Sequence, residues 1–389
     1  MFEKDEATLA SMGAQITTKE IMQQPDLWED TLRIYEDNLE AIQDFLAKAR
    51  ALGGARRTRV IFCGAGTSAY VGDTLVPYLR RVGDNESFEF APVATTDVVC
   101  APRDYVRPED PTVMVSFARS GNSPESMAAY ERVGQVAKDL LYLNVTCAPE
   151  GRLAQESKGD ERALTLLIPR ANDKGFAMTG SYSCMLLLSA LIFDQGSIED
   201  KRAWVALAAK MGRAVVARES EVKAWLDRDF DRVTYLGSAS LSGLAREAQL
   251  KILELCAGRI ATSFDSSMGY RHGPKSFVDD KTLVFDFVSN DPYTRQYDLD
   301  ILNEIKGDEI ALATVGIQQG TGNDFAGENF SFDDEALLPE AYLALPYVMF
   351  AQTVAINASV KVGNTPDTPS PTGTVNRVVK GVTIHPFSL

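Results

Sequence analysis

Apolar residues recur along the chain with two different spacings, and the order of these spacings predicts the fold. Over residues 1–50 the apolar positions follow alternating steps of three and four, which is the spacing of one face of an α-helix. Examples are Leu32, Tyr35, Leu39, Ile42 and Leu46. We therefore expect residues 1–50 to form a helical N-terminal segment.

Further along, the pattern changes to short apolar runs that alternate with helical stretches. The runs predict buried strands at 60–62, 113–115, 140–143 and 164–168. The stretches between or after them predict helices at 68–81, 124–138 and 181–194. Because strands that are buried on both faces occur in parallel sheets covered by helices, this alternation predicts an α/β fold with helices on both faces of a parallel sheet.

The same pattern starts again after a helical bridge at 197–227. Further strands are expected at 233–236, 283–288 and 310–315, and further helices at 244–255 and 339–361. Residues 61–68 and 235–242 share one order of features, namely a strand, a small-residue loop with glycine, a hydroxyl residue and a helix. We interpret the chain as a duplicated α/β fold, with a first domain at 51–205 and a second at 206–389. The second includes a C-terminal tail rich in Pro, Thr and Gly, expected to be an ordered loop or an arm over a neighbouring surface.

Composition and charge exclude several classes of protein. The 389 residues are 45% hydrophobic and 24% charged, which excludes a mostly disordered chain. Asp and Glu (54) outnumber Lys and Arg (39), giving a net charge of −15, which argues against nucleic acid as a partner. No apolar run approaches the roughly 20 residues of a membrane span, and the N-terminus lacks a signal-peptide core. We expect a cytoplasmic protein without membrane contact.

Cysteine and histidine are too scattered to predict a metal site. The five cysteines share no CxxC spacing, which fits reduced thiols and not a disulfide framework. The two histidines are His272 and His385, so a zinc site would need widely separated ligands. We expect neither a metal nor a redox cofactor.

Two loops carry groups that suit a phosphate. In the first, glycines and hydroxyl residues lie where a predicted strand turns into a helix, so the backbone can approach a ligand and the helix N-terminus offers unpaired N–H groups. The second loop has the same place after the strand at 113–115. The candidate residues are Gly64, Gly66, Thr67 and Ser68 in the first loop, and Ser116, Ser120, Asn122 and Ser123 in the second. Because ligands of parallel sheets bind at the carboxyl ends of strands, both loops are expected to form one phosphate cradle.

The alternative is that these residues only cap helices and make turns, and one loop alone would not distinguish the two interpretations. Neither loop has the lysine of the G-x-x-x-x-G-K-[ST] motif. Ala69 occupies the third glycine position of G-x-G-x-x-G. A small phosphomonoester therefore fits better than a nucleoside triphosphate or a dinucleotide.

One predicted helix and the loop after it carry candidate acid–base groups. Glu247, Lys251 and Glu254 fall at i, i+4 and i+7, so they share one face of the helix. Such a triplet is either a solvated face, which is the commoner case, or a buried functional stripe. His272 lies in a Gly/Pro turn, and an imidazole pKa of ~6.5 suits proton exchange near neutral pH. A surface or helix-capping histidine is the alternative.

These motifs resemble the tandem sugar isomerase (SIS) domain family. They are CGAGTSA at 63–69, SFARSGNSPES at 116–126, REAQLKILEL at 246–255 and GYRHGPKSFVDD at 269–280. The similarity is closest to the AgaS group of the galactosamine pathway, with which YTRQYDLDIL at 293–302 and GNTPDTPSPTGTVNRVV at 363–379 also agree. It runs from about residue 15 to the end and extends, more distantly, to the isomerase half of glucosamine-6-phosphate synthase. The resemblance implies two SIS domains, each a parallel sheet flanked by helices.

The resemblance also implies roles for individual residues. Glu254 falls on the base that moves a proton between C1 and C2 of the sugar, supported by Glu247 and Lys251. His272 falls on the ring-opening histidine, which in the synthase comes from a neighbouring subunit. Lys380 falls near a lysine that contacts the sugar. The phosphate-binding hydroxyls fall on Ser68, Ser120 and Ser123, with Gly66, Thr67, Gly121 and Asn122 nearby.

Two departures from the synthase shape the expected function. Ala118 and Arg119 stand where its loop has Ser-Gln, so phosphate binding there is expected to use Arg119 or fewer hydroxyls. No glutaminase domain precedes the SIS pair, which favours release of ammonia or a reaction without ammonia. AgaS-like proteins have been named both galactosamine-6-phosphate deaminases and tagatose-6-phosphate ketose/aldose isomerases.

We expect a deaminating isomerase that converts galactosamine 6-phosphate to tagatose 6-phosphate and ammonia. Aldose–ketose isomerisation without ammonia release is the first alternative. A non-catalytic phosphosugar-binding SIS protein is the second, and a structural or partner-binding role is the third. The family implies a homodimer or a higher homo-oligomer.

Overall fold

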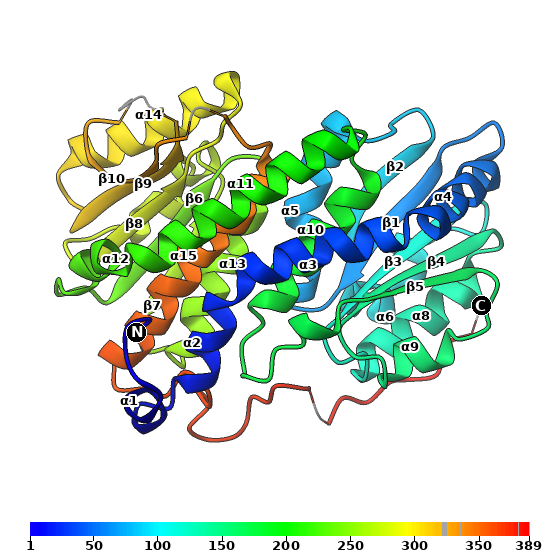
Figure 1. Cartoon of the computed structure of the whole chain (residues 1–389), viewed down its shortest axis with the longest axis horizontal. Helices are drawn as coiled ribbons and strands as arrows, with labels where there is room; N and C mark the ends of the chain where they lie inside the picture. Colours follow the sequence, from blue (N-terminus) through cyan, green and yellow to red (C-terminus); the bar gives the residue numbers. More distant parts are fainter. Residues whose placement is uncertain (321–324, 335, 380, 389) are drawn as a thin grey trace. The chain divides into compact units, whose positions relative to one another are not determined.

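The computed structural model describes residues 1–320, 325–334, 336–379 and 381–388, which form two compact units (Figure 1). The first-sheet unit comprises Leu27–Asp173, Gly180–Arg202 and Val375–Leu389. The second-sheet unit comprises Met1–Asp26, Lys174–Thr179 and Ala203–Thr374. Each unit is thus built from segments that are distant in sequence. The predicted division of the chain at residues 50 and 205 stays a proposal.

The first-sheet unit contains a five-stranded parallel sheet in the order β2-β1-β3-β4-β5. Every residue of β3 and β4, two of the three inner strands, is buried, as their continuous apolar sequences predict. The strands are β1 (Thr58–Gly64), β2 (Phe88–Ala94), β3 (Thr112–Ala118), β4 (Leu140–Thr146) and β5 (Ala163–Leu167).

Helices cover both faces of this sheet. On one face, Ile61 packs in a core with Val98 and Val133 from two helices. On the other face, the ring of Phe62 packs edge-on against Phe193, with 5.5 Å between the ring centroids. The helices are α4 (Leu39–Gly53), α5 (Thr67–Val82), α6 (Thr95–Cys100), α7 (Pro102–Tyr105), α8 (Pro124–Val136), α9 (Arg152–Glu156) and α10 (Gly180–Phe193).

The second-sheet unit contains another five-stranded parallel sheet, in the order β10-β9-β8-β6-β7. Leu236 and Val284 pack against Ile301 on one face. On the other face the ring of Phe285 packs edge-on against Phe350, with centroids 5.5 Å apart. The strands are β6 (Arg232–Gly237), β7 (Ala261–Asp265), β8 (Thr282–Phe287), β9 (Ala313–Gln319) and β10 (Glu328–Phe332).

The helices of the second-sheet unit pack around this sheet, and α13 contacts β6, β7 and α15. Two further helices, α3 (Gln24–Asp37) and α11 (Ile198–Ala217), contain two of the points at which the chain passes from one unit to the other. The remaining helices are α1 (Glu6–Ser11), α2 (Gln15–Met22), α12 (Glu219–Leu226), α13 (Ser240–Leu255), α14 (Pro292–Asp308) and α15 (Glu340–Lys361), with short 3₁₀ turns at Pro169–Ala171, Gly269–Arg271 and Pro274–Phe277.

The two sheets have the same topology, which supports the interpretation of the chain as a duplication. The first sheet, followed from its other edge, runs β5-β4-β3-β1-β2, and the second runs β10-β9-β8-β6-β7. Each strand of the second sheet therefore corresponds to the strand five places earlier in the chain. The predicted α/β fold with two parallel sheets, flanking helices and N-terminal helices is confirmed.

Three strands were missed by the sequence pattern, namely β2, β7 and β10, and all three are edge strands. An edge strand is covered on fewer sides, so its sequence need not be a continuous apolar run. The edge strand β7, for example, contains no fully buried residue. The predicted strand at 310–315 was placed too early, because Ile310 is 52% exposed and β9 begins at Ala313.

One described helix, α15, is long and apolar enough by length and composition to cross a membrane. Its apolar window is 94% buried inside the protein, where it contacts α12 and α13. Burial of this kind is typical of a core helix.

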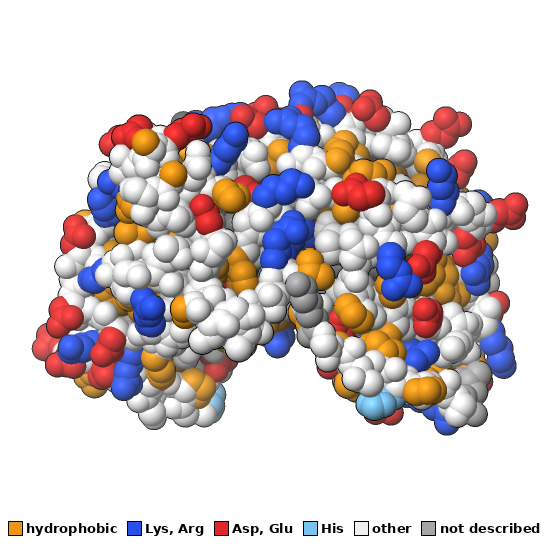
Figure 2. All heavy atoms as spheres, turned by 90° about the horizontal axis from the view of Figure 1, so that it is seen from below, with side chains coloured by type: hydrophobic (Ala, Val, Ile, Leu, Met, Phe, Trp, Pro, Cys, Tyr) orange, Lys and Arg blue, Asp and Glu red, His pale blue; other side chains and the backbone are white. Residues whose placement is uncertain are grey.

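On the face shown in Figure 2, Lys and Arg side chains are interspersed with Asp and Glu side chains.

A buried carboxyl group on β8 is expected to make stability depend on pH. Asp286 is fully buried, and burial together with the nearby Asp298 raises its pKa well above the ordinary value. Because the unfolded carboxyl group ionises near pH 4, folding takes up a proton above that pH, and stability falls as the pH rises toward the folded-state pKa. Asp286→Asn removes this loss. The melting temperature of the variant minus that of wild type should therefore increase from pH 5 to pH 8. A constant difference across that range would contradict the prediction.

Candidate active site

The loop between β1 and α5 has the geometry expected of an anion-binding turn. Gly66 caps α5 with φ 56°, in the region that favours glycine. A Cβ atom on Gly64 would lie 2.3 Å from the backbone of Ser68, so only glycine fits there. Thr67 and Ser68 form the first turn of α5, with 4% and 5% of their surface exposed. The loop therefore presents two hydroxyls and a helix N-terminus at the carboxyl end of β1.

The loop between β3 and α8 leaves the same edge of the sheet, because β1 and β3 are paired neighbours. Ser123 caps α8 by accepting a hydrogen bond from the Ser126 N–H at 3.2 Å, and Pro124 begins the helix. The Ser120 hydroxyl oxygen accepts from the Asn122 N–H at 3.3 Å, which leaves its own hydrogen to donate. The two loops are thus close enough in the sheet to act on one ligand.

Gly121 and Asn122 shape this second loop through their contacts with the first turn of α9. The Gly121 carbonyl accepts a hydrogen bond from the Leu153 N–H at 3.1 Å. The Asn122 side-chain oxygen accepts from the Arg152 N–H at 3.0 Å. Both residues therefore hold the loop in place, and Ser120 and Ser123 carry its hydroxyls.

Arg119 is 7% exposed and contacts the C-terminal segment of its own unit. Its guanidinium donates to the backbone carbonyl of Arg377 at 2.7 Å. The Arg377 side chain in turn donates to the carbonyl of Asp173. Arg119 therefore ties the second loop to the tail, and its predicted role in phosphate binding stays a prediction. Lys380 lies outside the described residues.

Two further hydroxyls lie at this edge of the first sheet. Ser116 on β3 and Thr95, the first residue after β2, are 5% and 2% exposed. Within the described part of the chain, neither hydroxyl has a hydrogen-bond partner. Ser116 is among the residues predicted for the second loop, whereas Thr95 was missed because β2 was not recognised. A buried hydroxyl without a partner is a ready donor to a ligand.

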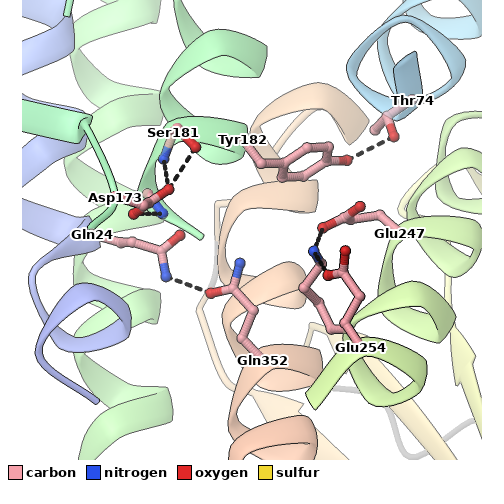
Figure 3. A network of polar contacts seen from close by, with 10 residues as sticks. Gln24, Thr74, Asp173, Ser181, Tyr182, Glu247, Glu254 and Gln352 are labelled. Atoms are coloured by element: carbon pink, nitrogen blue, oxygen red, sulfur yellow. Dashed lines mark hydrogen bonds and ion pairs between the residues drawn. The ribbon is translucent and has the colours of Figure 1, made fainter. Parts of the chain in front are cut away.

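The second-sheet unit carries the predicted acid–base residues on α13. Glu247 and Lys251 are fully buried, and the Glu254 side chain is 26% exposed. The Lys251 ammonium lies 3.3 Å from Glu247 Oε1 and 2.6 Å from Glu254 Oε2. Figure 3 shows the two carboxylates turned toward each other, with dashed lines to the ammonium between them. The solvated-face alternative is wrong for this helix, because α13 is enclosed by the sheet and α15.

The electrostatics of this trio leave one carboxylate oxygen available. Burial by itself lowers the pKa of Lys251, but attraction to Glu247 and Glu254 outweighs burial and raises the pKa above its ordinary value. The lysine therefore stays charged and compensates the buried Glu247. Oε1 of Glu254 has no hydrogen-bond partner among the described residues, and it belongs to the most exposed member of the trio.

His272 follows the 3₁₀ turn Gly269–Arg271 and is exposed. Its neighbours Arg271 and Lys275 both pair with Glu304 of α14, so the turn is anchored on either side of the imidazole. In the described residues, the His272 side chain makes no ion pair or hydrogen bond, and none joins it to Glu254. The structure therefore brings Glu247, Lys251 and Glu254 together, and among the described residues no hydrogen bond or ion pair joins His272 to them.

The predicted site residues fall into two groups, with the phosphate loops in the first-sheet unit and the acid–base residues in the second-sheet unit. The described residues contain no group of three His, Cys, Asp or Glu side chains placed to hold a metal. A cavity of about 470 Å³ lined by Arg56, Arg57, Arg59 and Arg107 lies at the amino ends of β1 and β3. It is at the opposite edge from the loops and is not the candidate site.

No protein-family model matches the chain. A curated relative from Escherichia coli, D-galactosamine-6-phosphate deaminase AgaS, is 40% identical over 376 residues, which cover 95% of this chain and 96% of that protein. The crystal structure of tagatose-6-phosphate ketose/aldose isomerase from Escherichia coli is 36% identical, with a TM-score of 0.88 and 99% of both chains covered. A structure from Clostridium novyi, proposed to be the same kind of isomerase, is 38% identical with a TM-score of 0.92, covering 100% of this chain and 99% of that one.

Identity at this level over nearly the whole length of both proteins, together with the paired sheets and their loops, shows the family. The chain belongs to the AgaS family of tandem SIS-domain enzymes, the amino-sugar-phosphate deaminases and isomerases.

Proposed function

We propose that this chain is a deaminating isomerase that converts D-galactosamine 6-phosphate to tagatose 6-phosphate and ammonia. The observation that carries the proposal is the trio on α13, in which a fully buried lysine pairs with one buried and one partly exposed glutamate. Such an arrangement supplies a carboxylate in a fixed position that can accept a proton. The names of the 40% identical relatives supply the substrate class.

The sugar ring must open first, because the C2 hydrogen is acidic only next to a free aldehyde. We assign ring opening to His272, which would move a proton between the ring oxygen and the anomeric hydroxyl. His272 is exposed, so its imidazole is accessible to a substrate and is not part of the hydrophobic core.

Glu254 then takes the proton from C2 while the C1 oxygen takes up a proton from water, which gives an enolamine; Glu254 returns its proton to C1 while the C2 amine gives a proton to water. The product is an imine at C2, which adds water and loses ammonia to give the ketose. One carboxylate serves both carbons because they are adjacent. Lys251 holds Oε2 of Glu254 at 2.6 Å and so leaves Oε1 for the proton transfer. Glu247 positions Lys251, and its charge keeps the lysine protonated.

The phosphate is assigned to the two loops of the first sheet. Ser68, Ser120 and Ser123 would donate hydroxyl hydrogens, while Thr67 and Gly66 place the N-terminus of α5 toward the anion. N–H groups and hydroxyls can compensate a phosphate without a local excess of Lys and Arg, so a net charge of −15 does not oppose binding. Binding energy gained at the phosphate, remote from C1 and C2, can be used to orient these carbons for reaction.

Ser120→Ala is expected to weaken phosphosugar binding by about 10- to 100-fold, since it removes one hydrogen bond to a charged group worth roughly 1.5–3 kcal/mol. Isothermal titration calorimetry with galactosamine 6-phosphate would measure the loss. Ser87→Ala is the matched control, because Ser87 lies at the amino end of β2, whereas the phosphate loops lie at the carboxyl ends of the strands. Equal affinity of the Ser120 variant and wild type would remove this loop from the site.

The test of the function is to incubate the protein with galactosamine 6-phosphate and glucosamine 6-phosphate separately and to measure ammonia and ketose phosphate. Ammonia and ketose in equal amounts support deamination. The solved relatives named tagatose-6-phosphate ketose/aldose isomerases favour one alternative, aldose–ketose isomerisation, which would convert tagatose 6-phosphate without ammonia. Binding without turnover of any of these sugars would favour a phosphosugar-binding protein.

We further propose that the enzyme is cytoplasmic and works as a homodimer or a higher homo-oligomer. An exposed His272 without an internal partner among the described residues fits a histidine that completes the site of a neighbouring subunit. Mixing inactive His272→Ala chains with inactive Glu254→Gln chains tests this, because sharing of sites between subunits would restore part of the activity. Sedimentation equilibrium would give the number of subunits.

A further inference from the structure

The carboxyl edge of the second sheet has a counterpart of the phosphate cradle. Gly237 and Ala239 occupy the places of Gly64 and Gly66, and Ala239 caps α13 with φ 49° and ψ −118°, close to the φ 56° and ψ −129° of Gly66. A Cβ atom on Gly237 would lie 2.7 Å from the Leu241 carbonyl oxygen, so this position has no room for a side chain. The same is true of Gly64 in the first loop. A non-glycine residue with positive φ is uncommon, so the same turn has been kept at a cost.

In this second cradle the hydrogen-bond donors are already occupied by a carboxyl group of the same chain, that of Asp298. Oδ1 of Asp298 accepts hydrogen bonds from the hydroxyls of Ser238 and Ser267, each at 2.5 Å. Oδ2 accepts from the Ser289 N–H at 2.9 Å. Asp298, Ser267 and Ser289 are fully buried.

The three donors come from loops after adjacent strands. Ser238 follows β6, Ser267 lies two residues after β7, and Ser289 lies two residues after β8. The corresponding strands of the first sheet are β1, β2 and β3. The hydroxyls after those strands are Thr67 and Ser68, Thr95, and Ser120.

The first sheet differs in having no carboxylate at the corresponding position of the corresponding helix. Both α8 and α14 begin at a proline, Pro124 and Pro292, and Asp298 lies six residues after the second. Six residues after Pro124 stands Tyr130, whose ring stacks on Tyr142 with centroids 3.9 Å apart. Thr95, the counterpart of Ser267 by strand, has a buried hydroxyl with no partner among the residues described.

We propose that Asp298 is an internal ligand that fills the second sheet's anion cradle, so that each chain keeps a single phosphosugar site, at the first sheet. This inference rests on the proposed phosphate-binding role of the first-sheet loops. It gives a function to the segment at 293–302, which the proposed mechanism does not use. Asp298 acts here as a specificity-determining residue, since it denies phosphate the donors that Ser238, Ser267 and Ser289 would otherwise offer.

The state of the neighbouring carboxyl group supports an ionised Asp298. Burial raises the pKa of Asp298, and the bonds from Ser238, Ser267 and Ser289 oppose that shift. Asp286 accepts only a long bond from Ser267, at 3.4 Å, and its Oδ1 has no partner in the described part of the chain. Both carboxyl groups are fully buried, and the one that accepts more hydrogen bonds is favoured in the ionised form, so the charge belongs on Asp298 and the proton on Asp286.

The test uses the full chain with Asp298→Ala, Asp298→Asn and Ser120→Ala. Asp298→Ala should melt lower than wild type by about 5 °C, because charge-assisted bonds are lost. Sodium formate should recover most of that loss, and sodium chloride at equal ionic strength should not. Wild type and Ser120→Ala should show no response specific to formate. Wild type should bind one galactosamine 6-phosphate per chain, and Asp298→Ala should bind that molecule with the same affinity while its emptied cradle becomes open to a second anion.

Three results would overturn the inference: two phosphosugars bound per wild-type chain, formate no better than chloride with Asp298→Ala, or Asp298→Asn as stable as wild type. If Asp298→Ala does not fold, Ser238→Ala replaces it, since alanine already occupies this place in the first loop as Ala65. Ser238→Ala should then lower the melting temperature of wild type more than that of Asp298→Asn, and equal losses would count against the proposal. If wild type binds no phosphosugar, the proposed function fails, while the formate test still applies to Asp298.

Discussion

Glu254→Gln is expected to reduce the rate of ammonia release by a factor of about 10²–10⁴, the usual contribution of a general base. The amide keeps the size of the carboxylate, and its oxygen can still accept the hydrogen bond that Lys251 gives to Oε2 at 2.6 Å. What it cannot do is take the C2 proton. The dissociation constant for galactosamine 6-phosphate should stay within about two-fold of wild type, because only the transition state loses an interaction. Steady-state ammonia release and calorimetric binding would measure the two quantities.

The matched control is Glu221→Gln, which changes another glutamate of the second-sheet unit. Glu221 lies on α12 and pairs with Arg218, with 45% of its side chain exposed. It should keep wild-type turnover. If Glu254→Gln also keeps near wild-type turnover, the base is a different residue and the proposed mechanism is wrong.

Lys251→Met is expected to lower the free energy of unfolding by about 3–5 kcal/mol, the range for breaking a buried ion pair from one side. The reason is that Glu247 would remain fully buried with its charge no longer compensated by the ammonium at 3.3 Å. Glu254 is partly exposed, so water can replace part of what it loses. Activity should fall as well, since nothing would then hold Glu254 Oε2. Urea unfolding at pH 7 and turnover at low temperature would measure the two effects.

A second substitution separates the buried charge from the loss of packing. Adding Glu247→Gln to Lys251→Met removes both charges, so the double variant should recover a large part of the lost stability without recovering activity. Arg57→Met breaks an ion pair with Glu89 in which both side chains are about half exposed, and it should leave stability nearly unchanged. A double variant less stable than Lys251→Met would show that Glu247 is not the source of the penalty.

The central strands of both sheets could be predicted because they are buried on both faces, so their sequences are continuous apolar runs, as in β3 and β4. The edge strands β2, β7 and β10 could not, because exposure on one side relaxes the demand for apolar residues. The helix α14 also escaped prediction, since its sequence from 292 to 308 carries many charged residues and only four buried ones.

Within the candidate site, two strand-to-helix turns could be predicted from their glycine and hydroxyl residues, because the conformation of a turn depends on residues that are adjacent in sequence. The spacing of Glu247, Lys251 and Glu254 likewise predicts a shared helix face. Spacing does not say whether that face meets water or the core. The packing of α13 between its sheet and α15 made it a buried stripe. Thr95 became a candidate only when β2 placed its hydroxyl at the carboxyl end of the sheet, beside the loop after β1.

The sequence by itself determined the local features of this protein: the class of fold, the duplicated strand–loop–helix openings and the residues able to carry acid–base chemistry. These follow from interactions between residues a few positions apart, which periodicity and turn chemistry record directly. The tertiary structure alone decided which of these groups are buried, which carboxylate faces a lysine, and that Asp298 reaches the hydroxyls of Ser238 and Ser267. Asp298 is 60 residues from Ser238 and 31 residues from Ser267 in the sequence, so local patterns do not record these contacts. Burial depends in addition on every element that packs around a residue.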